Sequence, residues 1–131
     1  MIPSNTFSGN QMHAPQQITL YGIAHCDTVK KARAWLTARG LTHAFHDFKK
    51  IGLAESLLDA WMSDLPWERL LNRQGMMWRK LSDEARASVV DAASARAVML
   101  AHPSIIKRPV VHWPDDRLTI GFDVAHWTAR L

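Results

Sequence analysis

The chain has 131 residues, of which 47% are hydrophobic and 21% charged, and its formal net charge is +4. This indicates one globular domain large enough to bury a core, and it excludes a membrane-spanning protein, because no apolar run approaches the ~20 residues that a transmembrane helix needs. The basic residues are interleaved with acidic ones and never run beyond two, which argues against direct nucleic-acid binding.

The first seventeen residues are rich in Ser, Asn, Gln and Pro and show no hydrophobic periodicity. A flexible tail is therefore expected over residues 1–17, and one domain over residues 18–131. The tail lacks a basic start followed by an apolar core, so it does not read as a secretory signal. The single cysteine, Cys26, excludes an internal disulfide, which fits a reducing cytoplasm, and we expect a cytoplasmic protein.

The start of the domain predicts a strand, a turn and a helix. Apolar residues over Ile18–Tyr21 favour a short strand, which Gly22 ends. A helical pattern begins close to Asp27 and stops at Gly40, which suits the left-handed position after a helix C-terminus. Cys26 therefore lies in the strand-to-helix turn, at or just before the first helical turn.

Further strands are expected on both sides of a long helical segment. Alternating side chains over Leu41–Phe48 predict a second strand, and the strand–helix–strand order predicts that it pairs in parallel with the first. Near the C-terminus, strand residues over 105–113 flank the Lys–Arg–Pro step. Pro114–Arg117 has turn chemistry, and Leu118–Gly121 can pair back in antiparallel fashion. Asp123 is expected to cap a last helix.

Residues 53–102 form a helical insert between these strands, because their pattern is helical almost throughout. Pro66 is expected to open a short helix, Ser82 to cap a helix that runs to about Ala92, and Ser94 to cap another that ends before Pro103. The element order, β-α-β, helical insert, β-β-α, predicts an α/β protein with a thioredoxin-like fold: a mixed sheet of about four strands flanked by helices, with an inserted helical subdomain.

Cys26 is the residue most suited to chemistry. Unpaired N–H groups and the positive end of a helix dipole favour an anion such as a thiolate, and helix N-termini and cations lower cysteine pKa values from about 8.5 to roughly 3.5–7.5. His25 and Lys30 would add to this effect. Asp27 would oppose it if it pointed inward, but at a helix start it is expected to cap the helix. Thr28 either places its hydroxyl near the sulfur or completes the cap. The alternative is a buried structural cysteine.

Three separated motifs resemble one family. They are YGIAHCDTVKKARAWL (21–36), MMWRKL (76–81) and IIKRPVV (105–111), and with the spacing between them they are similar to the YffB branch of the arsenate reductase (ArsC)/Spx family. The resemblance runs from about Ile18 to Leu131. It implies a thioredoxin-like fold in which Cys26 is the nucleophile and Pro109, opposite it, follows a cis peptide bond.

The resemblance also implies an anion site. Arg79 and Arg108 match two arginines that hold the oxyanion in arsenate reductases, and a guanidinium suits an oxyanion or a carboxylate such as glutathione carries. Asp27 and Thr28, in the same turn as the cysteine, are expected to belong to this substrate- and anion-binding site. The place of a third family arginine falls near Gly121, and Arg117, in the turn, is a poor substitute. The site is therefore incomplete for arsenate, which argues against arsenate as the physiological substrate.

The absence of a second cysteine determines the expected redox partner. Redox enzymes of this class often carry a resolving cysteine three residues after the first, where this chain has Val29, so an outside thiol such as glutathione or glutaredoxin must resolve Cys26. We expect no bound cofactor. We also expect no metal, because the seven histidines have no ligand spacing with the cysteine or an acidic pair, and only His25 adjoins Cys26.

Two functions are consistent with these residues. The first is a glutathione- or glutaredoxin-dependent reductase of a small oxidised or oxyanion substrate. The alternative is a regulator without catalytic activity that binds RNA polymerase, as the related Spx proteins do. Many Spx proteins sense redox through a Cys-x-x-Cys pair, and the lack of that pair disfavours a disulfide switch here.

Overall fold

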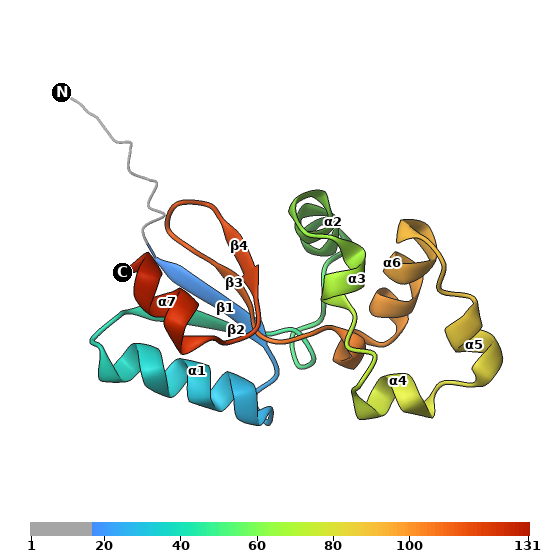
Figure 1. The fold of residues 1–131 in the computed structure, drawn as a ribbon, viewed down its shortest axis with the longest axis horizontal. Helices are drawn as coiled ribbons and strands as arrows, with labels where there is room; N and C mark the ends of the chain where they lie inside the picture. The colour runs from blue at the N-terminus through green and yellow to red at the C-terminus, as the bar shows by residue number, and fades with distance from the viewer. Residues whose placement is uncertain (1–16) are drawn as a thin grey trace.

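The computed structural model describes residues 17–131 (Figure 1). The predicted tail over residues 1–17 therefore lies, apart from its last residue, outside the described residues. Among the residues described, no helix combines the length and apolar character needed to cross a membrane.

A mixed four-stranded sheet organises the fold, in the order β2-β1-β3-β4. Strand β1 (Ile18–Gly22) pairs in parallel with β2 (His43–Asp47), as the strand–helix–strand order predicts. On its other side β1 pairs antiparallel with β3 (Val110–His112), which pairs antiparallel with β4 (Leu118–Ile120). The predicted α/β thioredoxin-like class with a four-stranded mixed sheet is confirmed.

Two helices pack against one face of the sheet. Helix α1 (Asp27–Ala38) crosses from β1 to β2, and α7 (Val124–Arg130) closes the chain (Figure 1). Gly40 has φ +69°, and the N–H of Leu41 reaches back to the carbonyl of Leu36 at 2.9 Å, so α1 ends as its glycine predicts. Alternate strand residues and one stripe of each helix form this core: Ile18, Leu20, Ala32, Leu36, Val111, Trp113 and Trp127.

Between β2 and β3 the chain forms the helical insert. Within residues 55–101 it contains α2 (Glu55–Asp64), α3 (Trp67–Leu70), α4 (Met76–Lys80), α5 (Asp83–Ala87) and α6 (Ala92–Ala101). In Figure 1 these helices gather on one side of the sheet.

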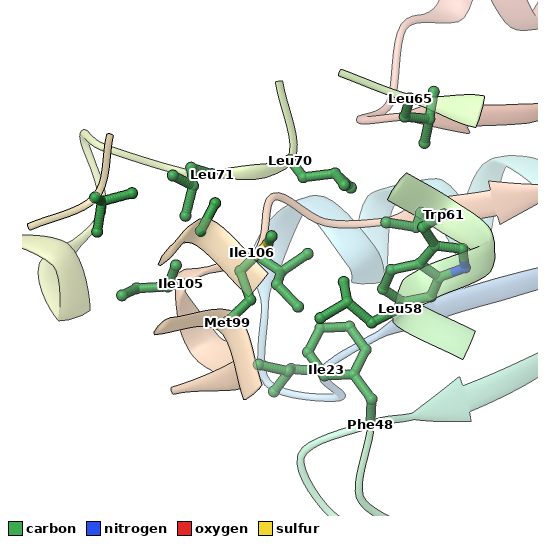
Figure 2. Packing of buried hydrophobic residues seen from close by; sticks show 13 residues of the cluster. Ile23, Phe48, Leu58, Trp61, Leu65, Leu70, Leu71, Met99, Ile105 and Ile106 are labelled. Atoms are coloured by element: carbon green, nitrogen blue, oxygen red, sulfur yellow. The ribbon is translucent and has the colours of Figure 1, made fainter. Parts of the chain in front are cut away.

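A second core joins the insert to the sheet (Figure 2). Ile23 and Phe48 follow β1 and β2, and they pack with Leu58 and Trp61 of α2. The Phe48 and Trp61 rings meet edge to face with their centroids 6.2 Å apart. The Met and Trp residues of the insert thus include core residues, such as Met99, which is fully buried. The insert is held to the sheet where the strand leading to Cys26 ends.

Two helix boundaries differ from the prediction. Ser82 caps α5 as expected, but the helix ends at Ala87 rather than near Ala92, and Ser94 is not the cap of α6. The cap is Asp91, whose carboxylate accepts the N–H of Ser94 at 2.9 Å while the Ser94 hydroxyl accepts the N–H of Asp91 at 3.0 Å. This reciprocal pair fixes Asp91 in extended geometry, so the preceding helix must stop before it.

The segment before β3 also differs. Strand structure was expected on both sides of the Lys–Arg–Pro step, but the residues before it form a short 3₁₀ helix, Pro103–Ile105, with proline in its first turn. Ile106 makes only an isolated bridge with Leu71. A proline at a helix start is pre-set for helical φ, which explains the turn. This segment leads directly to Arg108.

Candidate active site

Cys26 is the N-cap residue of α1. Its backbone is extended, with φ −85° and ψ 123°, its N–H donates to the carbonyl of Ile23 at 3.1 Å, and its own carbonyl accepts the N–H of Lys30 at 2.9 Å. Gly22 makes this turn possible, because a Cβ there would lie 2.8 Å from Cγ2 of Val29. The end of β1 therefore packs closely on the first turn of α1, with the thiol at the junction.

A carboxylate on β2 also holds this turn. Asp47 accepts the N–H of Ala24 through Oδ2 at 3.1 Å, and through Oδ1 the N–H groups of Lys49 and Lys50, each at 3.0 Å. Burial raises the pKa of this carboxyl, but the three N–H donors together lower it more, so its pKa lies below the ordinary value. Asp47 thus connects the loop before Cys26 to the loop after β2.

The Cys26 thiol is half-buried, and its pKa depends on burial and on three neighbouring groups. Burial is the largest single influence and raises the pKa. The N–H of Val29, the guanidinium of Arg108 and the N–H of Thr28 each lower it, and together they outweigh burial. The pKa therefore lies below its ordinary value, and the thiolate is more populated at neutral pH than in an unperturbed cysteine.

One expectation for this turn, the role of Asp27, needs revision. Asp27 was expected to cap α1, but it is the first helical residue, and the helix has no side-chain cap because Cys26 holds the capping position. That expectation was wrong. Thr28 acts on the sulfur through its backbone N–H. His25, Asp27 and Thr28 are all exposed.

Arg108 reaches the thiol from the far end of the insert. Its Nη1 donates to the Ser104 carbonyl at 2.7 Å, and its guanidinium lowers the pKa of the Cys26 thiol. Its Nε is buried and has no hydrogen-bond partner among the described residues. The Arg108–Pro109 peptide bond is cis, as the resemblance implied, and Pro109 is buried. The Pro109 carbonyl accepts the N–H of Gly121 at 2.8 Å.

The Arg79 side chain bonds to the loop before α4 and not to the thiol. Arg79 lies on α4, its side chain is exposed, and its Nη2 donates to the Gln74 carbonyl at 2.6 Å. Within residues 17–131 the groups that act on the thiol include Arg108 and not Arg79. The structure thus brings Thr28 and Arg108 to the Cys26 thiol, and it leaves Arg79 bonded to a carbonyl of the loop before α4.

A pocket of about 190 Å³ adjoins Arg108. Sequence reasoning did not identify it. Lys80 follows Arg79 in the MMWRKL motif, but sequence alone does not tell which of the two cations faces the site. The residues that line the pocket come from α4, the loop before it and the 3₁₀ segment: Asn72, Gly75, Met76, Met77, Lys80, Ser104 and Arg108.

The fold and the three motifs can now be compared with known proteins. The sequence profile of the ArsC family matches residues 21–129. The chain belongs to the ArsC family. The predicted resemblance is confirmed, and the matched segment contains Cys26, Arg79 and Arg108.

Relatives within the ArsC family match nearly the whole described chain. A solved structure of a protein named YffB is 41% identical, covers 86% of this chain and 97% of its own, and has a TM-score of 0.79. An arsenate reductase (ArsC) related protein from Brucella melitensis is 50% identical, covers 86% of this chain and 92% of its own, and has a TM-score of 0.71. An uncharacterised protein of Haemophilus influenzae is 36% identical over 112 residues, which are 86% of this chain and 96% of that protein.

The described part of the chain contains no group of side chains that could bind a metal ion together. There, no group of three or more His, Cys, Asp or Glu side chains is arranged to hold a metal ion. The chemistry of the site is that of a thiol beside a guanidinium.

Proposed function

We propose that this protein is a thiol-dependent reductase in which Cys26 is the nucleophile and an outside thiol, glutathione or glutaredoxin, resolves it. The observation that carries the proposal is the Cys26 thiol at the N-cap of α1, where the Val29 and Thr28 N–H groups and the Arg108 guanidinium hold its pKa below the ordinary value. Membership of the ArsC family and the 50% identity to an arsenate reductase-related protein support the reductase class.

The reaction is a pair of thiol–disulfide exchanges. The Cys26 thiolate attacks one sulfur of a disulfide R–S–S–R′, so a Cys26–S–S–R bond forms, the substrate S–S bond breaks, and R′S⁻ leaves and takes a proton from solvent. Glutathione thiolate then attacks the R sulfur of the adduct, which releases the Cys26 thiolate and the disulfide of glutathione with R. The net reaction oxidises one glutathione sulfur to the disulfide level as the R′ sulfur is reduced to a thiol, and a second glutathione would release R as a thiol from the mixed disulfide. A second cysteine is not required.

The backbone and Arg108 have separate tasks in this scheme. The N–H groups of Val29 and Thr28 stabilise negative charge on the sulfur before attack and when Cys26 leaves the adduct. Arg108, fixed by the Ser104 carbonyl, stabilises the same charge and positions an anionic group of the substrate.

An oxidised sulfur suits this site better than arsenate. Arg108 lies at the thiol, whereas Arg79 is bonded to the Gln74 carbonyl, and the place of a third arginine falls at Gly121, whose N–H bonds the Pro109 carbonyl. An arsenate monoanion or dianion would face one guanidinium at the thiol, where the arsenate reductases use three arginines. We therefore propose a disulfide substrate, with glutathione mixed disulfides as its nearest class.

Mass spectrometry of the intact protein tests the proposal. With oxidised glutathione, the wild type is expected to gain one glutathione on Cys26 and to lose it when reduced glutathione is added, while Cys26→Ser gains none. Exchange through Cys26 should be faster than exchange of the same disulfide with glutathione alone at the same pH. An adduct of equal yield in Cys26→Ser, or exchange no faster than the uncatalysed reaction, overturns the proposal. The RNA polymerase-binding alternative would then be tested by purifying the protein with its partners.

A further inference from the structure

The pocket beside Arg108 is small and polar at one end. Its volume of about 190 Å³ is below the ~300–1,000 Å³ of sites that enclose a drug-sized ligand. It therefore suits one functional group of a substrate rather than the whole molecule. Arg108 belongs both to this pocket and to the surroundings of the Cys26 thiol, so the pocket and the thiol share one guanidinium.

Lys80 places a second cation in this pocket. Residues three and four apart lie on one face of a helix, so Lys80 shares a face of α4 with Met76 and Met77. Met76, Met77 and Lys80 accordingly line the pocket together, and Arg79 does not. Among the described residues no acidic side chain lies within 4.0 Å of the Lys80 ammonium, and none lines the pocket.

Asn72 adds an amide donor. Its Oδ1 accepts the N–H of Gln74 at 3.2 Å, which leaves its Nδ2 as the other end of the amide. A Cβ on Gly75 would lie 2.7 Å from that Nδ2, so the amide lies close against the glycine backbone at the pocket. The lining thus combines an ammonium, a guanidinium and an amide N–H₂, and the buried Nε of Arg108 still lacks an acceptor among the described residues.

We propose that this pocket binds a carboxylate of the disulfide substrate, and that Lys80 determines the preference for anionic disulfides. The inference rests on the proposed function and gives its substrate class: a disulfide with a carboxylate within a few bonds of the sulfur that Cys26 attacks. Arg108 bridges the two parts of the site. Lys80 holds the carboxylate and takes no part in the bond exchange at sulfur.

The test compares three small disulfides of similar size and different charge on the full-length protein. They are dithiodipropionate, which is anionic, bis(2-hydroxyethyl) disulfide, which is uncharged, and cystamine, which is cationic. The rate of mixed-disulfide formation on Cys26 is measured by intact mass at one pH and low salt. The wild type is expected to react fastest with the anionic and slowest with the cationic compound.

Lys80→Gln is expected to lower the rate with dithiodipropionate about fivefold, since one charge at ~4 Å in a solvated site is worth about that factor. Its rate with the uncharged disulfide should stay within about twofold of the wild type, and this rate also shows that the variant is folded. Arg79→Gln removes the same charge one residue away and outside the pocket, and is expected to keep the anionic preference.

The outcomes separate the two proposals. If the thiol reacts rapidly with the uncharged disulfide but Lys80→Gln keeps the wild-type ratio of anionic to uncharged rates, the pocket inference is wrong and the reductase proposal stands. The pocket inference is also wrong if Arg79→Gln, and not Lys80→Gln, loses the preference. If Cys26 reacts with all three compounds no faster than free glutathione, both proposals fail.

Discussion

Gly22→Ala tests the link between the end of β1 and the thiol. The new methyl group would lie 2.8 Å from Cγ2 and 3.4 Å from Cγ1 of Val29, and 3.6 Å from the Phe45 ring. Real Cβ contacts do not come as close as 2.8 Å, so Val29 must move. Val29 is buried in the first turn of α1, and its N–H is one of the groups that lower the Cys26 pKa against the effect of burial.

Two effects are therefore expected from this one methyl group. Overpacking of a buried side chain costs about 1–3 kcal/mol, so the free energy of unfolding should fall by that amount in urea titrations. Displacement of the Val29 N–H from the sulfur should raise the Cys26 pKa, which a pH series of iodoacetamide alkylation rates would show. Both effects arise from the same contact.

A double-mutant cycle isolates that contact. Val29→Ala removes the two methyl groups that the new Cβ would meet, so Gly22→Ala should cost much less in the Val29→Ala background than in the wild type. Equal costs in the two backgrounds would refute the steric reasoning. So would a Gly22→Ala variant with wild-type stability and a wild-type alkylation profile.

Three further predictions follow from the described contacts. Arg108→Gln should raise the Cys26 pKa and move the alkylation profile to higher pH; an unmoved profile would show that the guanidinium does not act on the thiol. Met99→Ala removes a fully buried side chain and should lower the free energy of unfolding by about 2–5 kcal/mol in urea; a loss below about 1 kcal/mol would contradict the core packing. The Asp47 carboxyl has a depressed pKa, so its stabilising effect is complete above its ordinary value of about 3.9 and is lost as pH falls through the lower folded value. Asp47→Asn should therefore flatten the fall in stability below about pH 4, and equal acid sensitivity of the two proteins would disprove the role of its N–H donors.

The parts of the fold that the sequence predicts best depend on local signals. The end of β1 at a glycine, the helix from Asp27 and its stop at Gly40 each rest on the conformational preference of one or two residues, and all three are observed. The predicted cap of α6 was wrong because the start of this helix depends on two residues together. Asp91 and Ser94 are both good caps three residues apart, and their reciprocal hydrogen bonds, rather than either preference alone, place the helix start at Ala92.

The sequence predicts which residues belong to the site, but it does not predict where their side chains point. Cys26 follows from the strand–turn–helix pattern, and Arg108 from its motif. That the Arg108 guanidinium acts on the thiol depends on the way the chain returns from the insert through the 3₁₀ segment, which no local pattern contains. Whether Arg79 or Lys80 faces the site depends on how a five-residue helix is rotated, and tertiary packing decides that rotation.

The most direct test of the account is the pH dependence of Cys26 alkylation in the wild-type protein. It is measured with and without a dicarboxylate that carries the charge of an anionic disulfide but has no S–S bond. The account predicts a midpoint below the ordinary cysteine value of about 8.5, because the Val29 and Thr28 N–H groups and Arg108 outweigh burial, and it predicts slower alkylation when the anion is present. A midpoint at or above that value, with no protection by the anion, would contradict it.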